Sequence, residues 1–142
     1  MIEEMKKVIW LSLFVLAAIV ISCDKESEFE GGECSHNTGK NCMSCHKDFK
    51  LAGSVYDKSL NSAYAGAKIK VNTQANGAGS ALLSLTSDKT GNYYMGSSVN
   101  FGSGIYVGVE GTSGTVKYMN SPINSGACNS CHGSSTSKVW AE

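Results

Sequence analysis

Hydrophobic and polar residues alternate along the middle of the chain. Three stretches show the alternation most clearly, with their apolar or small positions at Leu51, Gly53 and Val55, at Ala67, Ile69, Val71 and Thr73, and at Ile105, Val107 and Val109. Polar or small residues such as Lys68, Lys70 and Asn72 fill the positions between them. Because successive side chains of a strand point to opposite faces, this period of two predicts half-buried strands.

Shorter segments of the same kind predict further strands. They cover residues 81–86, 92–96 and 115–119, and Gly-, Asn- and Asp-rich turn sequences separate them. Short strands divided by such turns are typical of all-β domains. The pattern therefore predicts a mainly β fold, a small antiparallel β-sandwich of six or seven strands over residues 50–119.

The first 22 residues have the pattern of an export signal. Lys6 and Lys7 precede an apolar run from Val8 to Ile21, which is short for a membrane span. The sequence Val20-Ile21-Ser22-Cys23 resembles a bacterial lipobox, which implies lipidation of Cys23 and a stable membrane anchor. We expect an exported bacterial lipoprotein, periplasmic or at the outer membrane or cell surface, with residues 23–33 as an acidic tether.

Two copies of the pentapeptide Cys-x-x-Cys-His bracket the predicted sandwich. This spacing allows two thiols to attach one haem covalently while the adjacent His ligates its iron. We expect two haem c groups, the first on Cys42 and Cys45 with proximal His46, and the second on Cys128 and Cys131 with proximal His132. Residues 34–49 and 120–142 would form these haem-binding loops, with short helical turns.

Two other interpretations of the paired cysteines were weighed. Four thiolates could hold one zinc ion, but zinc needs no His directly after each pair. A thioredoxin-like dithiol opens a helix after a strand in a βαβ unit, and the sequence predicts no such unit here. Both alternatives therefore rank below haem.

Candidates for the sixth iron position are few. His36 lies in a polar segment just before the first motif, and such segments resemble the distal-His stretches of multihaem cytochromes. Met119 lies before the second motif at the end of a predicted strand, where it either ligates iron or packs in the core. Met43 lies within the haem loop and is not expected to be a ligand, and Met95 is expected to face the core.

The middle of the chain carries a second resemblance, in four ordered segments. They are Gly53-Ser54-Val55-Tyr56-Asp57, residues 65–71, residues 88–93 and residues 104–109. Together they resemble the carboxypeptidase regulatory-like, transthyretin-like β-sandwich. In that family the module is usually non-catalytic, which implies a spacer or an interaction platform here. The proline that often precedes the second segment is replaced by Ala63-Tyr64.

The composition narrows the function. The chain has no net formal charge and no arginine, which argues against a nucleic-acid partner. We expect an electron carrier rather than an enzyme, exchanging electrons with respiratory or extracellular redox proteins. The alternatives are a haem enzyme or gas sensor with one open iron, and a haem-bearing module for self-association. Cys34 has no assigned role, and three alternatives stay open: a free thiol, an intermolecular disulfide or an iron ligand.

The number of strands decides where the two motifs lie. An even number of up-and-down strands places both at one pole of the sandwich, and an odd number separates them unless residues 120–127 fold back. Extended, these residues reach about 28 Å, enough to return along a small domain.

Overall fold

The computed structural model describes residues 35–142 and contains strands joined by turns, with three short 3-10 helices. The seven strands are β1 (Leu51–Ser54), β2 (Lys68–Asn72), β3 (Ala81–Thr86), β4 (Asn92–Met95), β5 (Tyr106–Glu110), β6 (Val116–Tyr118) and β7 (Gly126–Ala127). The 3-10 helices are η1 (Cys42–Ser44), η2 (Ala75–Gly77) and η3 (Cys128–Ser130). The predicted export signal, the tether, Cys23 and Cys34 lie outside the described residues.

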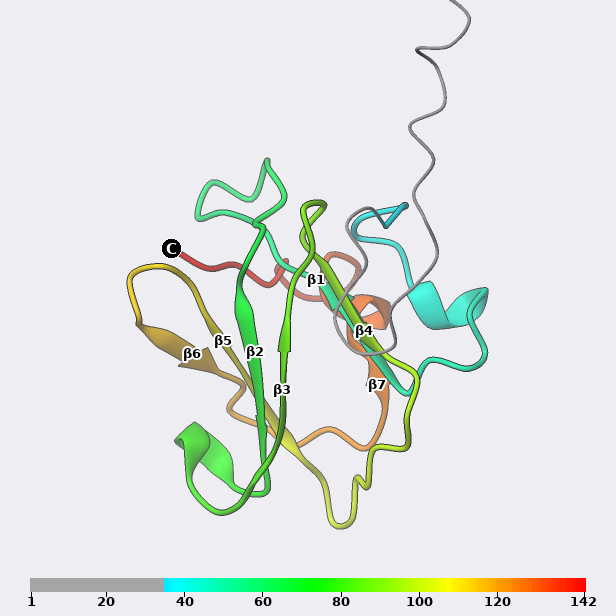
Figure 1. Cartoon of the computed structure of the whole chain (residues 1–142), viewed down its shortest axis with the longest axis vertical. Coiled ribbons are helices and arrows are strands. Elements are labelled where there is room, and N and C mark those ends of the chain that lie inside the picture. The colour runs from blue at the N-terminus through cyan, green and yellow to red at the C-terminus, as the bar shows by residue number, and fades with distance from the viewer. Residues whose placement is uncertain (1–34) are drawn as a thin grey trace, which may run out of the picture.

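The strands form two sheets (Figure 1). One has the order β4-β1-β7 and the other the order β3-β2-β5-β6. The predicted mainly β fold of six or seven short strands is confirmed. The strands within residues 50–119 pair antiparallel as predicted, and the one parallel pair among the described strands joins β1 to β7, which lies in the predicted C-terminal loop. Parallel strands need a crossover, and the chain reaches β7 by folding back after β6 rather than through a hairpin.

One hydrophobic core lies between the sheets. Ile69 and Val71 of β2 are fully buried, and Val107 and Val109 of β5 are 5% exposed, as the alternation predicts. Leu51, Val55 and Tyr93 contribute to the same core from the first sheet. The predicted inward position at Thr73 is exposed instead. The β2–β3 register shifts between Val71 and Asn72, and β2 ends at Asn72.

Strand β1 departs from the prediction of a half-buried strand. All four of its residues are buried. The cause is its position, since β1 has strands on both edges and both η1 and η3 pack against it. The strand therefore lies at the centre of the region that holds the two motifs.

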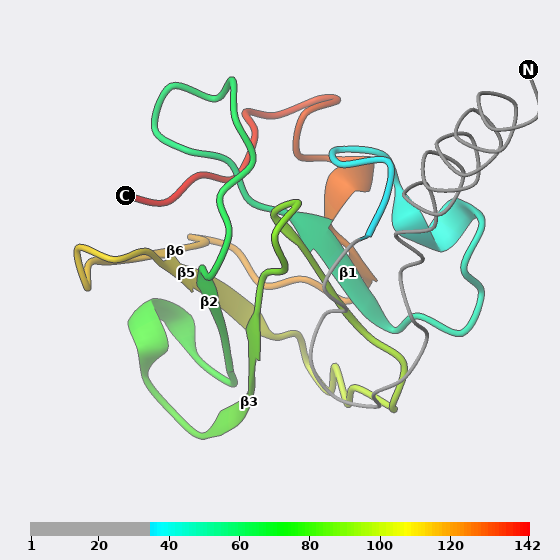
Figure 2. The ribbon, with the colours of Figure 1, turned by 45° about the horizontal axis from the view of Figure 1, so that its top comes forward.

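The last residues are part of the fold. The Tyr56 amide donates to the Val139 carbonyl and the Ala141 amide donates to the Tyr56 carbonyl, each at 2.9 Å. The turned ribbon view shows this final segment passing close to the second motif (Figure 2). Within residues 35–142, no helix has the length and apolar character needed to cross a membrane.

Candidate functional site: two attachment loops beside one strand

The two Cys-x-x-Cys-His motifs have the same local structure. In η1 the Cys42 carbonyl accepts hydrogen bonds from the amides of Cys45 at 3.2 Å and His46 at 2.9 Å. In η3 the Cys128 carbonyl accepts from the corresponding Cys and His at 3.2 and 3.0 Å. The tight turn brings both thiols and the His to one loop, as attachment of a single haem requires.

The serine inside each motif fastens its turn in the same way. Ser44 Oγ donates to the Asn41 carbonyl at 2.7 Å, and Ser130 Oγ donates to the Ala127 carbonyl at 2.6 Å. Asn41 also caps η1, because its side chain accepts from the Met43 amide, whereas Ala127 offers no such cap. The internal resemblance of the motifs therefore extends from sequence to hydrogen bonding.

The fold brings the motifs together. In both ribbon views η1 and η3 lie side by side next to β1 (Figure 1, Figure 2). Asn129 of the second motif donates to the Lys40 carbonyl, two residues before Cys42, at 2.9 Å. The segment between β6 and β7 has thus folded back, and the two motifs occupy one side of the domain.

A first pocket of about 490 Å³ opens beside the first motif. Its lining includes Cys42, Cys45 and His46 together with His36. The ring centroids of His36 and His46 are 5.6 Å apart. Both imidazoles therefore line the pocket that also holds the thiols of the first motif, and these are the groups that the predicted haem would need.

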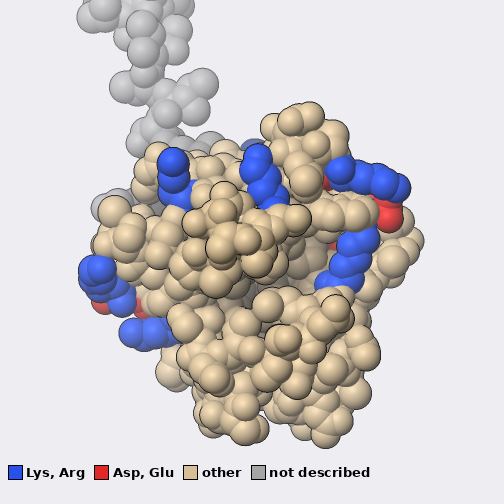
Figure 3. Space-filling view, turned by 180° about the vertical axis from the view of Figure 1, so that it is seen from behind, with Lys and Arg blue, Asp and Glu red and all other residues tan. Residues whose placement is uncertain are grey.

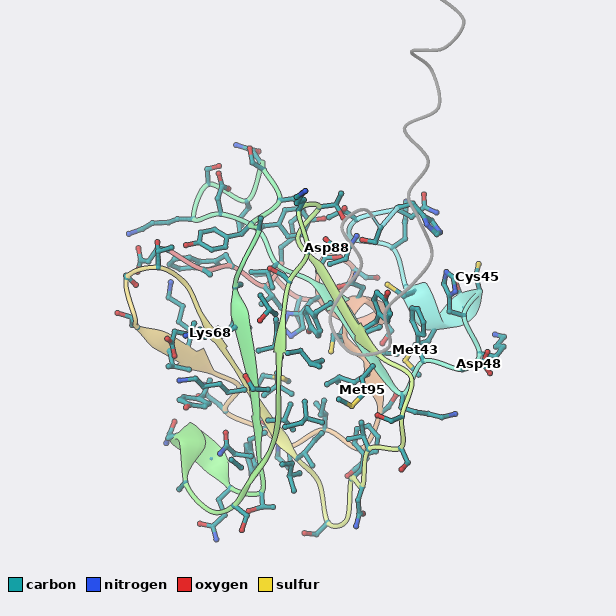
Figure 4. All side chains as sticks on the ribbon, viewed as in Figure 1. Met43, Cys45, Asp48, Lys68, Asp88 and Met95 are labelled. Atoms are coloured by element: carbon teal, nitrogen blue, oxygen red, sulfur yellow. The ribbon has the colours of Figure 1, made fainter. Side chains whose placement is uncertain are left out.

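Aromatic rings support His46 from one side. The ring of Phe49 stacks on His46 with centroids 4.6 Å apart, and Tyr94 stacks on Phe49 at 4.5 Å. The outer part of this motif is open, since Cys45 is exposed and lies at the outer edge of η1 (Figure 4). Stacking therefore limits the orientations of the exposed imidazole.

A second pocket of about 370 Å³ lies beside the second motif. Cys128, His132 and Met119 line it, together with Val107 and Val109 from the inner face of β5. Met119 also packs against the hydrophobic core. The thioether thus shares a pocket with the proximal His and belongs to the core as well.

The ring of His132 is already oriented. Its Nδ1 lies 2.8 Å from the Ser137 carbonyl oxygen and 3.3 Å from Thr136 Oγ1. A hydrogen bond from Nδ1–H to the carbonyl leaves Nε2 unprotonated and available to a metal. This pairing of a ligating His with a backbone carbonyl is the usual support of a metal-binding imidazole.

The thiol environments weigh against a redox dithiol. Burial raises the pKa of the Cys42 thiol and of the Cys128 thiol. A thioredoxin-like dithiol depends on the opposite shift, a lowered pKa that yields the reactive thiolate. The zinc alternative needs all four sulfurs around one point, whereas Cys42 and Cys128 line different pockets. Among the described residues, no three His, Cys, Asp or Glu side chains form a metal-binding group.

Tyr93 is the residue that both pockets share. It is 1% exposed, and burial, with a smaller contribution from the adjacent Cys128, raises its pKa well above the ordinary value. A Cβ on Gly53 would collide with the Tyr93 hydroxyl and would lie 2.9 Å from Cys128 Cβ. Gly53 therefore allows Tyr93 and the second motif to meet over β1.

Charged residues differ between the pockets. Lys117 and Lys138 line the second, and Lys40 lines the first. Lys117 Nζ lies 2.8 Å from the Trp140 ring centroid and 3.3 Å from Glu142 Oε1. Seen from behind, lysines lie separately around the upper part of the molecule (Figure 3). Lys138 Nζ donates to the Leu60 carbonyl at 2.9 Å and lies 4.2 Å from the Tyr56 ring centroid, so both ammonium groups at the second pocket already have partners within the chain.

The predicted site residues of the described chain thus fall into two groups: His36, Cys42, Cys45 and His46 at the first pocket, and Met119, Cys128 and His132 at the second, with Cys131 in the same loop. Met95 packs against the core as predicted, and Met43 lies in η1 and outside both pocket linings (Figure 4). Sequence reasoning missed Tyr93, Asn129 and Ser54. The position of Asn129 inside a motif could have indicated its role, whereas no sequence feature indicated a role for Ser54.

No protein-family model matches the chain, and no curated protein or solved structure matches it significantly.

Proposed function

We propose that this protein is an electron carrier, a dihaem c-type cytochrome held at a membrane by a lipid on Cys23. The supporting observation is that each Cys-x-x-Cys-His motif lines its own pocket, in which its His shares the lining with a side chain able to be the second axial ligand. A filled sixth position favours electron transfer over binding of small molecules. The central β fold is then a scaffold, as its resemblance to a non-catalytic module implies.

The haem iron supplies one-electron redox chemistry, and the chain supplies the setting. At the first pocket His46 and His36 offer two imidazole nitrogens, which favour a lower potential. At the second, His132 and Met119 offer a nitrogen and a thioether, which raise it.

The test begins with covalent loading. The chain, expressed with its signal in a bacterium that attaches haem c, is expected to gain the mass of two haems, and each pair of Cys→Ala changes is expected to remove one. Near-infrared magnetic circular dichroism of the oxidised protein is expected to show one bis-His and one His/Met haem. A chain that carries no covalent haem would overturn the proposal.

Carbon monoxide separates the carrier from a haem enzyme or gas sensor. The reduced protein is expected to resist carbon monoxide, because both sixth positions are filled. Rapid binding of one molecule per chain would show an open iron and favour the alternative.

The membrane anchor has its own test. The Cys23→Ser protein is expected to be released in soluble form from cells in which the unaltered protein stays in the membrane fraction. Equal release of both would contradict lipid anchoring and leave the haem assignment standing.

A further inference from the structure

We propose that Asn129, inside the second motif, positions the chain segment that carries His36 at the first motif. The inference rests on the proposed function, in which His36 and His46 ligate the first iron. Asn129 would therefore act at the first haem site, although it lies in the motif of the second.

The amide of Asn129 is buried and fully hydrogen-bonded. Its Oδ1 accepts from the Ser54 amide at 3.1 Å, and its Nδ2 donates to Ser54 Oγ and to the Lys40 carbonyl, both at 2.9 Å. Asn129 is 6% exposed and Ser54 is 1% exposed. Polar groups buried so deeply need all their partners, so this geometry is strongly specified.

The hydrogen bonds continue from Ser54 into the segment before the first motif. Ser54 Oγ accepts from the Gly39 amide at 2.8 Å and donates to Asn92 Oδ1. Asn92 Nδ2 in turn donates to Ser35 Oγ at 2.8 Å and to Thr38 Oγ1 at 3.2 Å. Residues 35–40 are thus fastened at four points, which flank His36 on both sides.

Outside this network the segment is held by side-chain contacts with Thr90, one of them between Ser35 Oγ and Thr90 Oγ1 at 2.7 Å. It contains no strand or helix, and the His36 side chain is exposed. Thr38 Oγ1 donates to the Thr90 carbonyl at 2.9 Å, so the remaining support also comes from side-chain contacts. A distal ligand on such a segment stays near the iron only while the segment keeps its place, because an unfastened loop samples many conformations.

The first motif offers the matched control. Met43 occupies in Cys42–His46 the position that Asn129 occupies in Cys128–His132. It lies outside the hydrogen-bond network just described and outside the lining of both pockets. Both positions fall between the cysteines, so neither substitution removes an attachment thiol or a proximal His.

The experiment compares Asn129→Ala with Met43→Ala in the haem-loaded protein, by near-infrared magnetic circular dichroism and by carbon monoxide binding after reduction. Asn129→Ala is expected to lose the bis-His signature of the first haem and to bind one carbon monoxide per chain. The His/Met signature of the second haem, in whose motif the change lies, is expected to persist. Met43→Ala is expected to match the unaltered protein.

Two results would overturn the inference. One is retention of the bis-His signature and of carbon monoxide resistance in Asn129→Ala. The other is an effect confined to the second haem, as expected for mere damage to η3. If Asn129→Ala fails to mature, Thr38→Val tests the same network, since it removes a hydroxyl that fastens residues 35–40. It is expected to increase carbon monoxide binding at the first haem only, and no increase would also overturn the inference.

The unaltered protein separates this inference from the proposed function. If it carries two haems without a bis-His signature, the ligand assignment of the first haem fails, and the positioning role of Asn129 fails with it. If it has that signature but the Asn129 and Thr38 variants match the unaltered protein, the proposed function stands and only the positioning role of Asn129 is wrong.

Discussion

The two attachment motifs share a turn and differ in everything that surrounds it. Each is a 3-10 turn fastened by its own serine. The first projects from the domain, and its exposed His46 is supported by stacked rings. The second packs into the domain, where Cys128 contacts the core and the ring of His132 is hydrogen-bonded.

This difference shows how one short sequence can be placed in two distinct environments of one fold. In the proposed function the pentapeptide supplies the attachment thiols and the proximal ligand, and the surrounding fold supplies the distal ligand. A loop segment offers His36 to the first motif, whereas the end of a strand region offers Met119 to the second. The haems are therefore expected to differ although their motifs match.

Removal of the cysteines gives the largest expected effect. Each double change, Cys42→Ala with Cys45→Ala or Cys128→Ala with Cys131→Ala, is expected to remove one haem by mass. In haem-free protein only the second pair is expected to lower the free energy of unfolding, by roughly 1–2 kcal/mol, because Cys128 fills space in the core. Guanidinium unfolding measures this, and equal losses would contradict the contrast between the motifs.

Replacement of Met119 tests the second pocket. Met119→Leu conserves volume, which limits the loss of stability to about 1.5 kcal/mol, and it removes the thioether. We expect a lower midpoint potential for one haem and new carbon monoxide binding at that haem. Met95→Leu is the control, because Met95 packs against the same core without lining this pocket. Identical redox titrations of the two variants would show that Met119 serves only in packing.

Gly53→Ala tests the contact between β1 and the second motif. The added methyl group would collide with the Tyr93 hydroxyl and approach Cys128. We expect a loss of roughly 1–3 kcal/mol, typical of overpacking. Gly96→Ala is the control, since a Cβ there meets no atom within 4 Å. Similar thermal midpoints for the two variants would mean that Tyr93 moves aside freely.

The smallest expected effect concerns pH. Hydrogen bonds from Lys58 and then Lys117 lower the pKa of the Glu142 carboxyl. A lowered pKa in the folded protein stabilises it above the carboxyl's ordinary pKa, and this contribution is lost as the pH falls through the lowered value. We expect Glu142→Gln to lower the melting temperature slightly at neutral pH and not at all in strong acid. A difference independent of pH would contradict the ionic origin.

The sequence predicted the strands well and did not indicate which of them pair. Alternation identified the inward faces of β2 and β5, because those strands have one face in the core. It failed for β1, where the motif loops bury the other face, and for β7, which is two residues long and exists through its pairing with β1. Local alternation of hydrophobic and polar residues does not indicate which distant segments will contact each other.

The same limit applies to the candidate site. The motifs were sufficient to predict the attachment thiols and the proximal His, because covalent attachment of haem requires a fixed spacing. Ser54 and Asn129 are ordinary residues in sequence, and their importance arises only from hydrogen bonds that span 75 residues. Such long-range polar contacts depend on the completed fold.

The parallel pairing of β1 with β7 has a consequence for the order of assembly. The first motif is synthesised well before residues 126–129, so β1 then has one free edge and the Ser54 amide lacks its acceptor on Asn129. Contacts of such wide sequence separation form late, because loop closure must come first. The packing of the second motif against β1 and Lys40 is therefore expected to be among the last contacts to form, after the first motif has been synthesised.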